Sequence, residues 1–389
     1  MKAGQPEIIY LDHAATSWPK PREVVEAVHH AMLHESANPG RGSHRLAVQA
    51  SRVIFGTRRS LAKLFRVSNP NDIVLTPNTT HALNLGLKGY LRPGDHVVAT
   101  SVEHNSVRRP LEYLRRTIGV EVTYLQSDAM GRITAGQVEQ ALTARTTLVV
   151  ATHSSNLLGT IVPIGDIGEV TRKRGVRLLV DAAQSAGILP IDVEAMGIDM
   201  LAFPGHKGLL GPQGTGGLYI CPDVELTPIL HGGTGSQSEA VDQPDVRPDR
   251  YEAGTANTPA IAGLGAGVEL ILRESVEKIR DREWELTLRM LEGLSAIEGV
   301  RVLGPPTTER RTGIASFLIG TADPSEASFI LDQHYGIAVR SGFHCTPLAH
   351  GSAGTAETGA VRASVGYSTT VAEVDALLAA VKEIVKHYR

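Results

Sequence analysis

The stretch Asp199-Met-Leu-Ala-Phe-Pro-Gly-His206-Lys207-Gly208 begins as an apolar run and ends in a glycine-flanked turn that carries a lysine. A second stretch, Leu178-Leu-Val-Asp181-Ala-Ala-Gln184, also begins apolar and ends in polar residues. Short apolar runs bounded by turn residues are typical of buried strands. In open α/β sheets, reactive side chains gather beyond the carboxyl ends of the strands. The two stretches therefore predict a buried sheet with a chemically active edge.

Apolar runs alternate with helical patterns around these two stretches. The runs that predict strands are Asp72–Thr76, His96–Thr100, Glu121–Leu125, Thr147–Thr152, Arg177–Val180, Met200–Phe203 and Gly217–Ile220. Helical patterns near 80–91, 105–118, 136–143 and 164–174 separate most of them, and earlier helices are expected up to about His34 and over Ser43–Phe65. This alternation predicts an α/β fold with a mainly parallel sheet that helices cover on both faces.

The length of 389 residues exceeds what one hydrophobic core usually serves, so two domains are expected. We expect residues 1–255 to form an N-terminal segment and a large domain, and residues 256–389 to form a smaller α+β domain. A long helix predicted from about Ala260 to Ser295 opens the second domain. Residues 231–255 are rich in glycine, aspartate and proline, which favours a long functional loop.

Composition and charge exclude several classes of protein. The net charge is only −3 and aromatic residues make up 4% of the chain, so no nucleic-acid surface is expected. No apolar run reaches the length that spans a bilayer, and Met1–Tyr10 lacks the pattern of a signal peptide. Cys221 and Cys345 lie far apart without a CxxC partner, so neither a disulfide framework nor a cysteine-based metal site is expected. A reducing cytoplasm fits these features.

Lys207 has the surroundings expected of a lysine that forms a Schiff base. A lysine after a strand is most often a solvated surface charge, but the tight Pro204-Gly205 approach and the adjacent His206 favour a desolvated one. Asp181 follows its own buried strand, where it either caps a turn or faces a cation. Pyridoxal 5′-phosphate offers an aldehyde to Lys207 and a pyridinium nitrogen to Asp181. Gln184 is then a candidate partner of the phenolic oxygen of the ring.

Two further segments follow predicted strands. Thr76-Pro-Asn-Thr79-Thr80-His81 opens a helix, where backbone N–H groups and the hydroxyls of Thr79 and Thr80 suit a phosphate. A plain helix N-cap is the alternative. His104 is a candidate to stack on a flat cofactor and to move protons, although a histidine so placed often only satisfies local hydrogen bonds.

Arg362 and Asn156 are candidates for binding a substrate. Arg362 lies in a short apolar strand, and a guanidinium held there suits the carboxylate of an amino acid; a surface ion pair is the alternative. Cys345 lies in a loop with glycine and proline, beside His344, which favours an accessible reactive thiol over a small buried hydrophobic residue. Cys221 is expected to be structural.

Taken together, these residues resemble the class V aminotransferase-like family of pyridoxal phosphate enzymes, and within it the cysteine desulfurase and selenocysteine lyase group. The resemblance covers nearly the whole chain, and its motifs are Tyr10–Thr16, Asn38–Arg41, Glu103–Asn105, Asp181–Gln184, Gly205–Lys207, Glu252–Thr255, Arg340–Cys345 and Arg362. It implies a homodimer with the type I fold of pyridoxal phosphate transferases, whose large domain has a mainly parallel seven-stranded sheet. The short loop between Cys345 and Arg362 is more similar to Suf-type desulfurases than to the longer-loop Isc/Nif type.

The resemblance also implies roles for individual residues. Lys207 would hold the cofactor and act as the general base, and Cys345 would receive sulfur as a persulfide. The other cofactor contacts would be Asp181, Gln184, His104, Thr79, Thr80, His206 and Thr255, the last of them from the second subunit. The substrate contacts would be Asn156, Arg362 and His13.

The implied reaction converts L-cysteine to L-alanine and passes the sulfur to Cys345, then to a thiol or to a Suf-type acceptor protein. L-Selenocysteine is an alternative substrate, and a class V aminotransferase or lyase that does not use Cys345 is an alternative activity. A non-catalytic scaffold is a further alternative. Three positions depart from the family pattern: Pro204 replaces a phosphate-binding Ser or Thr, Phe343 replaces a histidine frequent in Suf-type members, and His13 replaces a small or amide residue.

Overall fold

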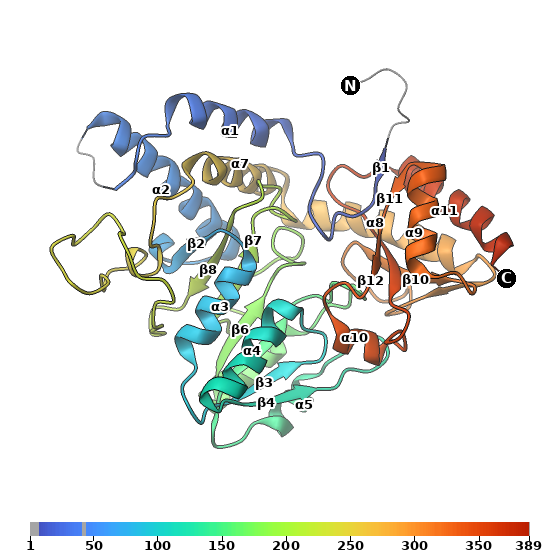
Figure 1. The fold of residues 1–389 in the computed structure, drawn as a ribbon, viewed down its shortest axis with the longest axis horizontal. Helices are drawn as coiled ribbons and strands as arrows, with labels where there is room; N and C mark the ends of the chain where they lie inside the picture. Colours follow the sequence, from blue (N-terminus) through green and yellow to red (C-terminus); the bar gives the residue numbers. More distant parts are fainter. Residues whose placement is uncertain (1–7, 41–43, 389) are drawn as a thin grey trace.

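The computed structural model of the chain describes residues 8–40 and 44–388. The motif residue Arg41 and the expected helix start at Ser43 lie outside the described residues, as do positions 1–7 of the segment considered for a signal peptide. Figure 1 shows a larger α/β body and a smaller one beside it, with the N-terminal strand next to the smaller body.

The large body is built on a seven-stranded sheet with the strand order β2-β8-β7-β6-β5-β3-β4. Its strands are β2 (Ile73–Thr76), β3 (His96–Thr100), β4 (Glu121–Leu125), β5 (Thr146–Thr152), β6 (Arg177–Asp181), β7 (Met200–Pro204) and β8 (Gly216–Ile220). β8 runs antiparallel to both of its neighbours, and the other neighbouring strands are parallel. All seven predicted strands are confirmed to within one residue at each end, and the mainly parallel sheet is confirmed.

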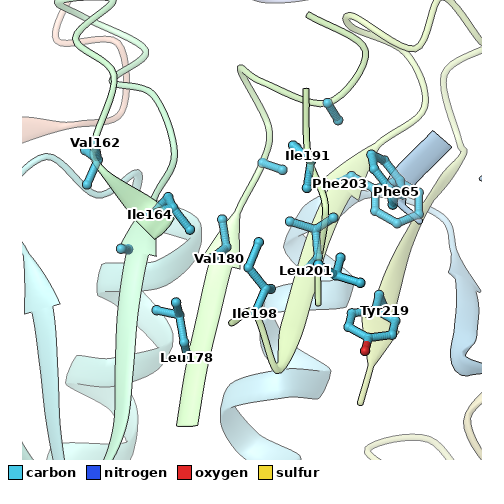
Figure 2. Close-up of a cluster of buried hydrophobic side chains, with 14 of the residues drawn as sticks. Phe65, Val162, Ile164, Leu178, Val180, Ile191, Ile198, Leu201, Phe203 and Tyr219 are labelled. Carbon is cyan, nitrogen blue, oxygen red and sulfur yellow. The ribbon is translucent and has the colours of Figure 1, made fainter. Parts of the chain in front are cut away.

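Helices cover both faces of this sheet because its strands are apolar on both sides. One face carries α3 (Thr79–Tyr90) and α4 (Asn105–Ile118), and the other carries α2 (Arg45–Phe65), α5 (Ala135–Ala141), α6 (Ile164–Arg174) and α7 (Thr258–Glu274). On β6, Leu179 is buried in the core of the first face. Its neighbours Leu178 and Val180 are buried on the second face, where Figure 2 shows Val180 beside Leu201 of the adjacent strand. Alternate residues of a strand thus fill opposite cores.

Two helices lie where one was expected. α7 ends at Glu274, and α8 (Val276–Ser295) begins directly after Ser275. Ser275 has a φ of 73°, and its side chain accepts a hydrogen bond of 3.3 Å from the amide of Lys278. α7 packs against α1 (Arg22–His34) and α2, whereas α8 packs against α11 (Val371–Ile384) in the smaller body. The prediction of a single helix over 260–295 is therefore wrong.

The smaller body contains an antiparallel sheet of order β12-β13-β10-β9 and is the predicted α+β unit. The strands of this sheet are β9 (Val300–Val302), β10 (Ile314–Ile319), β12 (Arg340–Gly342) and β13 (Ala360–Ser364). The smaller body also contains α9 (Pro324–Tyr335), α10 (Pro347–Ser352) and a 3₁₀ turn over Val385–His387. β1 (Ile9–Tyr10) pairs in parallel with β11 (Ile337–Ala338), so the first described residues belong to this body. The division between residues 255 and 256 stays a prediction.

Two 3₁₀ turns complete the elements, η1 (Pro70–Asp72) and η2 (Asp249–Tyr251). η2 lies in the long segment between β8 and α7. Directly after it, the Glu252 carboxylate pairs with Arg58 of α2 and accepts a 2.5 Å hydrogen bond from the amide of Leu75 on β2. These bonds tie the long segment to the edge of the large sheet. Within residues 8–40 and 44–388, no helix has both the length and the apolar character needed to cross a membrane.

Candidate active site

A cavity of about 240 Å³ lies beyond the carboxyl ends of β6 and β7, where the large body faces the smaller one. The predicted site residues that line it are Thr79, Thr80, His104, Asn156, Asp181, Gln184, His206, Lys207, Cys345 and Arg362. His13 and Thr255 do not belong to this set. A cavity at the carboxyl ends of parallel strands is where an open α/β sheet binds its ligand.

Lys207 lies in the turn that follows β7, and its ammonium group is buried. Burial lowers the pKa of Lys207 to about 8, with Asp181 opposing that shift and Arg362 and Arg340 adding to it. The turn can approach the neighbouring chain because residue 205 is glycine: a Cβ there would lie 2.0 Å from the Thr215 hydroxyl. The side chain of Lys207 is half-buried and lines the cavity, so it is not the solvated surface lysine of the alternative interpretation.

Asp181 ends β6, on the strand next to the one that precedes Lys207. Its carboxylate accepts a hydrogen bond of 2.9 Å from the amide of Ala183. Burial raises the pKa of Asp181, and the positive charge of Lys207 opposes that rise. Gln184 donates from its side-chain amide to the carbonyl of Ala14 at 3.0 Å, which fixes the amide at the wall of the cavity. A buried carboxylate near a buried amine suits a ligand that carries a ring cation.

The start of α3 forms one end of the cavity. Asn78 is the N-cap, because its side chain accepts a hydrogen bond of 2.9 Å from the amide of His81. The hydroxyl of Thr79 is buried and has no hydrogen-bond partner, while the hydroxyl of Thr80 lies 2.8 Å from that of Ser106. The N-cap alternative is therefore wrong for Thr79 and Thr80. Unpaired donors at a helix N-terminus fit a phosphate group.

Two histidines lie beside this end of the cavity, and both are neutral near pH 7. Burial lowers the pKa of His104 to about 4, and the charge of Lys207 acts in the same direction. The Nδ1 atom of His104 accepts a hydrogen bond of 3.0 Å from the amide of Ser106, so a neutral ring carries its proton on Nε2. Burial also lowers the pKa of His206 to about 4, and its Nδ1 lies 3.1 Å from the Thr16 hydroxyl. Pro204, at the end of β7, lines the cavity and offers no hydroxyl.

Arg362 projects from β13 at the opposite end and is buried. Its guanidinium donates to the carbonyl of Asn156 at 3.0 Å and to the carboxylate of Asp12 at 2.8 Å. The Nε atom is buried without a partner. The alternative of a surface ion pair is therefore wrong. A buried, oriented guanidinium with a free N–H fits a carboxylate.

Cys345 lies at the rim of the cavity, and its side chain is exposed. His344 and Cys345 both have left-handed backbones, with φ of 49° and 59°. Hydrogen bonds hold this loop: the Cys345 carbonyl accepts from the amide of Asn105 at 2.8 Å, and the His344 carbonyl accepts from the side chain of Asn156 at 2.6 Å. Strained backbone that is held in this way is typical of active sites. The alternative of a buried, structural cysteine is wrong for Cys345.

The position of His344 beside Cys345 in the sequence suggests a ring that activates the thiol, but the surroundings of this ring in the structure do not favour that role. The ring of His344 is buried and stacks on the ring of His350, with the ring centres 5.6 Å apart. Burial holds the pKa of His344 well below its ordinary value. The ring is therefore neutral and brings no positive charge to the thiol. The positive charges at this cavity come instead from Arg340, Arg362 and the ammonium group of Lys207.

The two remaining predicted residues do not line this cavity, although the smaller cavity that His13 lines is also lined by Gln184 and Lys207. His13 is buried with its Nε2 3.3 Å from the Thr369 hydroxyl, and it lines a smaller neighbouring cavity that also contains Glu283. Thr255 is exposed, between η2 and α7. The substrate contact of His13 and the contact of Thr255 across a dimer stay predictions.

Several residues that line the cavity were not among the predicted site residues, including Asn78, Ser106, Thr152 and Ser154, and Arg340 was predicted only as part of a motif. A sequence signal for Thr152 exists, because it is the last residue of a predicted strand, just as Asp181 directly follows one. Asn78 directly precedes Thr79, and Ser106 lies two residues after His104, so both are close in sequence to predicted site residues.

Cys221 donates from its thiol to the carboxylate of Asp223 at 2.9 Å. The ligand atoms of Asp199, Cys221 and Asp223 lie within 4.8 Å of one another, close enough in principle for a metal ion. However, Arg177 donates to both carboxylates at 2.8 Å. The guanidinium therefore already supplies the positive charge that this cluster needs.

A model of the aminotransferase class-V family matches residues 9–377. This chain belongs to the aminotransferase class-V family. A protein of Methanothermobacter thermautotrophicus named "Probable cysteine desulfurase" is 39% identical over 383 residues, which cover 97% of this chain and 94% of that protein. A protein of the same name from Pyrococcus abyssi is 34% identical, with coverage of 98% and 96%.

Solved structures of cysteine desulfurases resemble this class-V chain along almost its whole length. The apo structure of the enzyme from Thermococcus onnurineus NA1 has a TM-score of 0.91 and 34% identity, with coverage of 98% of this chain and 95% of that one. The cysteine desulfurase CsdA of Escherichia coli has a TM-score of 0.88 and 26% identity, with coverage of 98% and 96%. These likenesses confirm the type I fold and the family that the sequence motifs predicted. The class-V family implies pyridoxal phosphate as the cofactor.

The cavity of this class-V chain fits that cofactor in three respects. The buried amine of Lys207 and the buried carboxylate of Asp181 lie at the ends of adjacent strands. The hydroxyl of Thr79 is buried and unpaired at a helix N-terminus, where a phosphate group would complete its bonding. His104 supplies a neutral, flat ring at the wall of the same cavity.

Proposed function

We propose that the protein is a pyridoxal phosphate-dependent cysteine desulfurase, which removes sulfur from L-cysteine, releases L-alanine and keeps the sulfur on Cys345 as a persulfide. The observation that carries the proposal is that the exposed thiol of Cys345 and the buried amine of Lys207 line one cavity. The unpaired Nε of Arg362 at that cavity suits the carboxylate of an amino acid. The names of the relatives described above support the same activity.

Pyridoxal phosphate, when bound, supplies an electron sink that stabilises negative charge at the α-carbon of an amino acid. Lys207 would hold its aldehyde carbon and Asp181 its pyridine nitrogen. Gln184 would contact the phenolic oxygen, and His104 would lie against the ring. Thr79, Thr80 and His206 would bind the phosphate group. Pro204 contributes no hydroxyl, so the N-terminus of α3 supplies a larger share of the phosphate contacts.

Lys207 is suited to remove the α-proton of the substrate. A general base works best when its pKa lies near the working pH, and burial brings the pKa of Lys207 to about 8. Arg362 and Asn156 would hold the substrate carboxylate, so that the α-carbon faces the amine. Asp12 keeps the guanidinium of Arg362 in place through its 2.8 Å hydrogen bond.

Cys345 takes part in the sulfur-transfer step as the nucleophile. Its thiolate forms a bond to the substrate sulfur while the bond between that sulfur and the β-carbon breaks. The electron pair of the broken bond stays with the β-carbon, which takes up one proton to become the methyl group of alanine, and the α-carbon regains the proton that Lys207 removed. The products are L-alanine and a persulfide on Cys345. Because the thiol is exposed, a small thiol or a Suf-type acceptor protein can take the sulfur from it.

A homodimer belongs to the proposal. Large apolar side chains are exposed on two helices that both pack on α7, namely Val25, Met32 and Leu33 on α1 and Leu46, Val48 and Phe55 on α2. Exposed apolar groups of this extent favour a contact with another protein. A second copy seated there would also cover the segment of Thr255, which is exposed in the single chain. The proposed compartment is the reducing cytoplasm, where Cys345 stays a thiol between turnovers.

The test is the formation of L-alanine from L-cysteine in the presence of a reductant, for the wild type, for Cys345→Ala and for the control Cys221→Ala. We expect alanine from the wild type and from Cys221→Ala, and none from Cys345→Ala although this variant still binds the yellow cofactor. Equal turnover by Cys345→Ala would contradict the persulfide step and favour a class-V lyase or aminotransferase. Activity of Cys345→Ala on L-selenocysteine alone would identify the lyase alternative.

A further inference from the structure

The carbonyl oxygen of His206, the residue before Lys207, accepts hydrogen bonds from an unusual number of donors. Residues 16–20 provide all of them: the Thr16 hydroxyl at 3.0 Å, the Ser17 amide at 3.0 Å, the Ser17 hydroxyl at 3.1 Å and the Lys20 ammonium at 2.9 Å. A carbonyl oxygen has two lone pairs and commonly accepts one or two bonds. The peptide that carries Lys207 is therefore held more firmly than an ordinary turn.

Lys20 is the charged member of this group. It lies between Pro19 and Pro21, at the entrance to α1, and its ammonium group is partly buried. Its bonding partners there are neutral oxygens, the His206 carbonyl and the Ser17 hydroxyl, the latter at 2.8 Å. Burial lowers the pKa of Lys20 to about 8. Burying a cation is costly, and the side chain of a lysine just before a helix is long enough to reach solvent instead. Because Lys20 nevertheless contacts the His206 carbonyl, we infer that this contact has a function.

The segment that contains Lys20 also reaches the other end of the cavity. Asp12 accepts the hydrogen bond from Arg362, and the carbonyl of Ala14 accepts the one from Gln184. We call residues 12–20 the connecting segment. It contacts the arginine proposed to bind the substrate carboxylate and the peptide that carries the proposed base. One continuous piece of chain thus sets the distance between Arg362 and Lys207.

We propose that Lys20 is a positioning residue for Lys207. The amine of Lys207 must reach the cofactor carbon at one stage and the α-proton of the substrate at another. Both positions are set by rotation about side-chain bonds only if the backbone at His206 and Lys207 stays still. The charge-assisted hydrogen bond from Lys20 holds that backbone, since such bonds are about twice as strong as neutral ones. The inference rests on the proposed function, because it takes Lys207 as the residue that binds the cofactor.

The experiment compares the apoprotein of the wild type with Lys20→Met, Lys20→Arg and Ser17→Ala, and uses Lys63→Met on the exposed side of α2 as the control. Pyridoxal phosphate is added, and the rate at which the yellow absorption band appears is measured without any amino-acid substrate. Misplacing a reacting group by about 1 Å can cost on the order of 100-fold, and we expect a slowing of about tenfold in Lys20→Met. Lys20→Arg should restore most of the rate. Ser17→Ala should form the band about threefold more slowly than the wild type, because one neutral donor is removed. Lys63→Met should match the wild type.

Two further measurements distinguish a positioning role of Lys20 from a general loss of structure in the variant. The kcat for alanine formation should fall with the band rate in Lys20→Met, while the KM for L-cysteine stays within about twofold because Arg362 is untouched. The melting temperature of the apoprotein should change by no more than a few degrees.

The outcomes that would overturn the proposal are distinct. Equal band rates in the wild type, Lys20→Met and Ser17→Ala would exclude the positioning role. A large loss of thermal stability without rescue by Lys20→Arg would make Lys20 a structural residue only. If Lys20→Met does not fold, an unchanged band rate in Ser17→Ala would overturn the proposal. A wild type that forms no yellow band would overturn the proposed function, and this inference with it.

Discussion

The carbonyl of Cys345 accepts a hydrogen bond of 2.8 Å from the amide of Asn105, the first residue of α4. The next residue, Thr346, is fully buried and donates from its hydroxyl to the carbonyl of Glu103 at 3.1 Å. These two bonds flank His104, so the loop that carries the thiol and the ring at the cavity wall are joined through the backbone. The left-handed conformation of Cys345 depends on this support, because surrounding contacts must offset its strain.

Thr346→Val should therefore slow sulfur transfer without disturbing the cofactor. Valine keeps the shape and removes one buried hydrogen bond, which contributes about 1 kcal/mol. We expect alanine formation in a single turnover to slow by about fivefold, because about 1.4 kcal/mol corresponds to a tenfold change in rate. The absorption spectrum of the loaded enzyme should match the wild type.

The control for this loop is Thr358→Val, which removes an exposed hydroxyl that bonds the neighbouring Gly359 carbonyl. It should leave the single-turnover rate unchanged. A normal rate in Thr346→Val would show that the bond to Glu103 does not hold the thiol loop in its reactive position.

Arg362→Lys should weaken the binding of L-cysteine. Lysine keeps the charge but loses the planar fork, and with it the free Nε–H beside the cavity. We expect the KM to rise at least about tenfold, since a bidentate contact with a carboxylate contributes more than one single bond. The rate at which the yellow band forms should be unaffected. The matched control is Arg289→Lys, whose exposed guanidinium bonds Asp375 at 2.6 Å; a similar rise of KM in this control would contradict the assignment.

Lys207 should react with amine reagents at lower pH than an ordinary lysine. Burial lowers the pKa of Lys207 to about 8, whereas an ordinary lysine titrates near pH 10.4. In the apoprotein, the modification rate of the Lys207 peptide, followed by mass spectrometry, should rise with pH and level off above about pH 8.5. Peptides from exposed lysines serve as the internal comparison and should go on rising toward pH 10. A Lys207 profile that coincides with theirs would contradict the desolvated environment.

Glu283 should make the apoprotein less stable as the pH rises. It is buried on α8, and burial raises the pKa of Glu283 to about 8. Between its unfolded pKa near 4.3 and the folded value, the folded protein holds a proton that the unfolded chain has lost. The stabilising contribution is therefore complete below about pH 4 and is lost as the pH rises through about 8.

Glu283→Gln should remove this dependence, because glutamine resembles the protonated acid. The variant and the wild type should unfold in urea at similar midpoints at pH 5, and the variant should be more stable by at least about 1 kcal/mol at pH 8, since one pKa unit corresponds to about 1.4 kcal/mol. Glu285→Gln, an exposed position on the same helix, is the control and should keep the wild-type slope. Parallel pH profiles for the wild type and Glu283→Gln would contradict the prediction.

The strands could be predicted from the sequence because each is a short apolar run bounded by turn residues, and that pattern is local. The break between α7 and α8 could not. Neither glycine nor proline lies near Ser275, and the apolar pattern continues through it. The two helices separate because α7 packs on α1 and α2 while α8 packs on α11, and such packing overrides local preference.

The meeting of Lys207 and Asp181 could also be predicted, because both follow strands of one parallel sheet. The roles at the start of α3 could not be assigned so readily. Asn78 and Thr79 are consecutive polar residues, and either type can cap a helix. The backbone makes Asn78 the cap and leaves the Thr79 hydroxyl unpaired. The place of His13 could not be predicted either, because the course of β1 and the residues after it puts its ring in a neighbouring cavity beside Lys207 and Gln184.

The sequence by itself determined the strands of the large sheet, the reactive residues at their ends and the family to which the chain belongs, because these depend on residue type and short spacings. Tertiary structure alone decided which distant groups meet: Arg362 with Asp12 across 350 positions, and Lys20 with His206 across 186. It also decided that Cys345 is exposed while His344 beside it is buried. These outcomes depend on how the two bodies pack, and long-range packing leaves no periodic signal in the sequence that could reveal the contacts in advance.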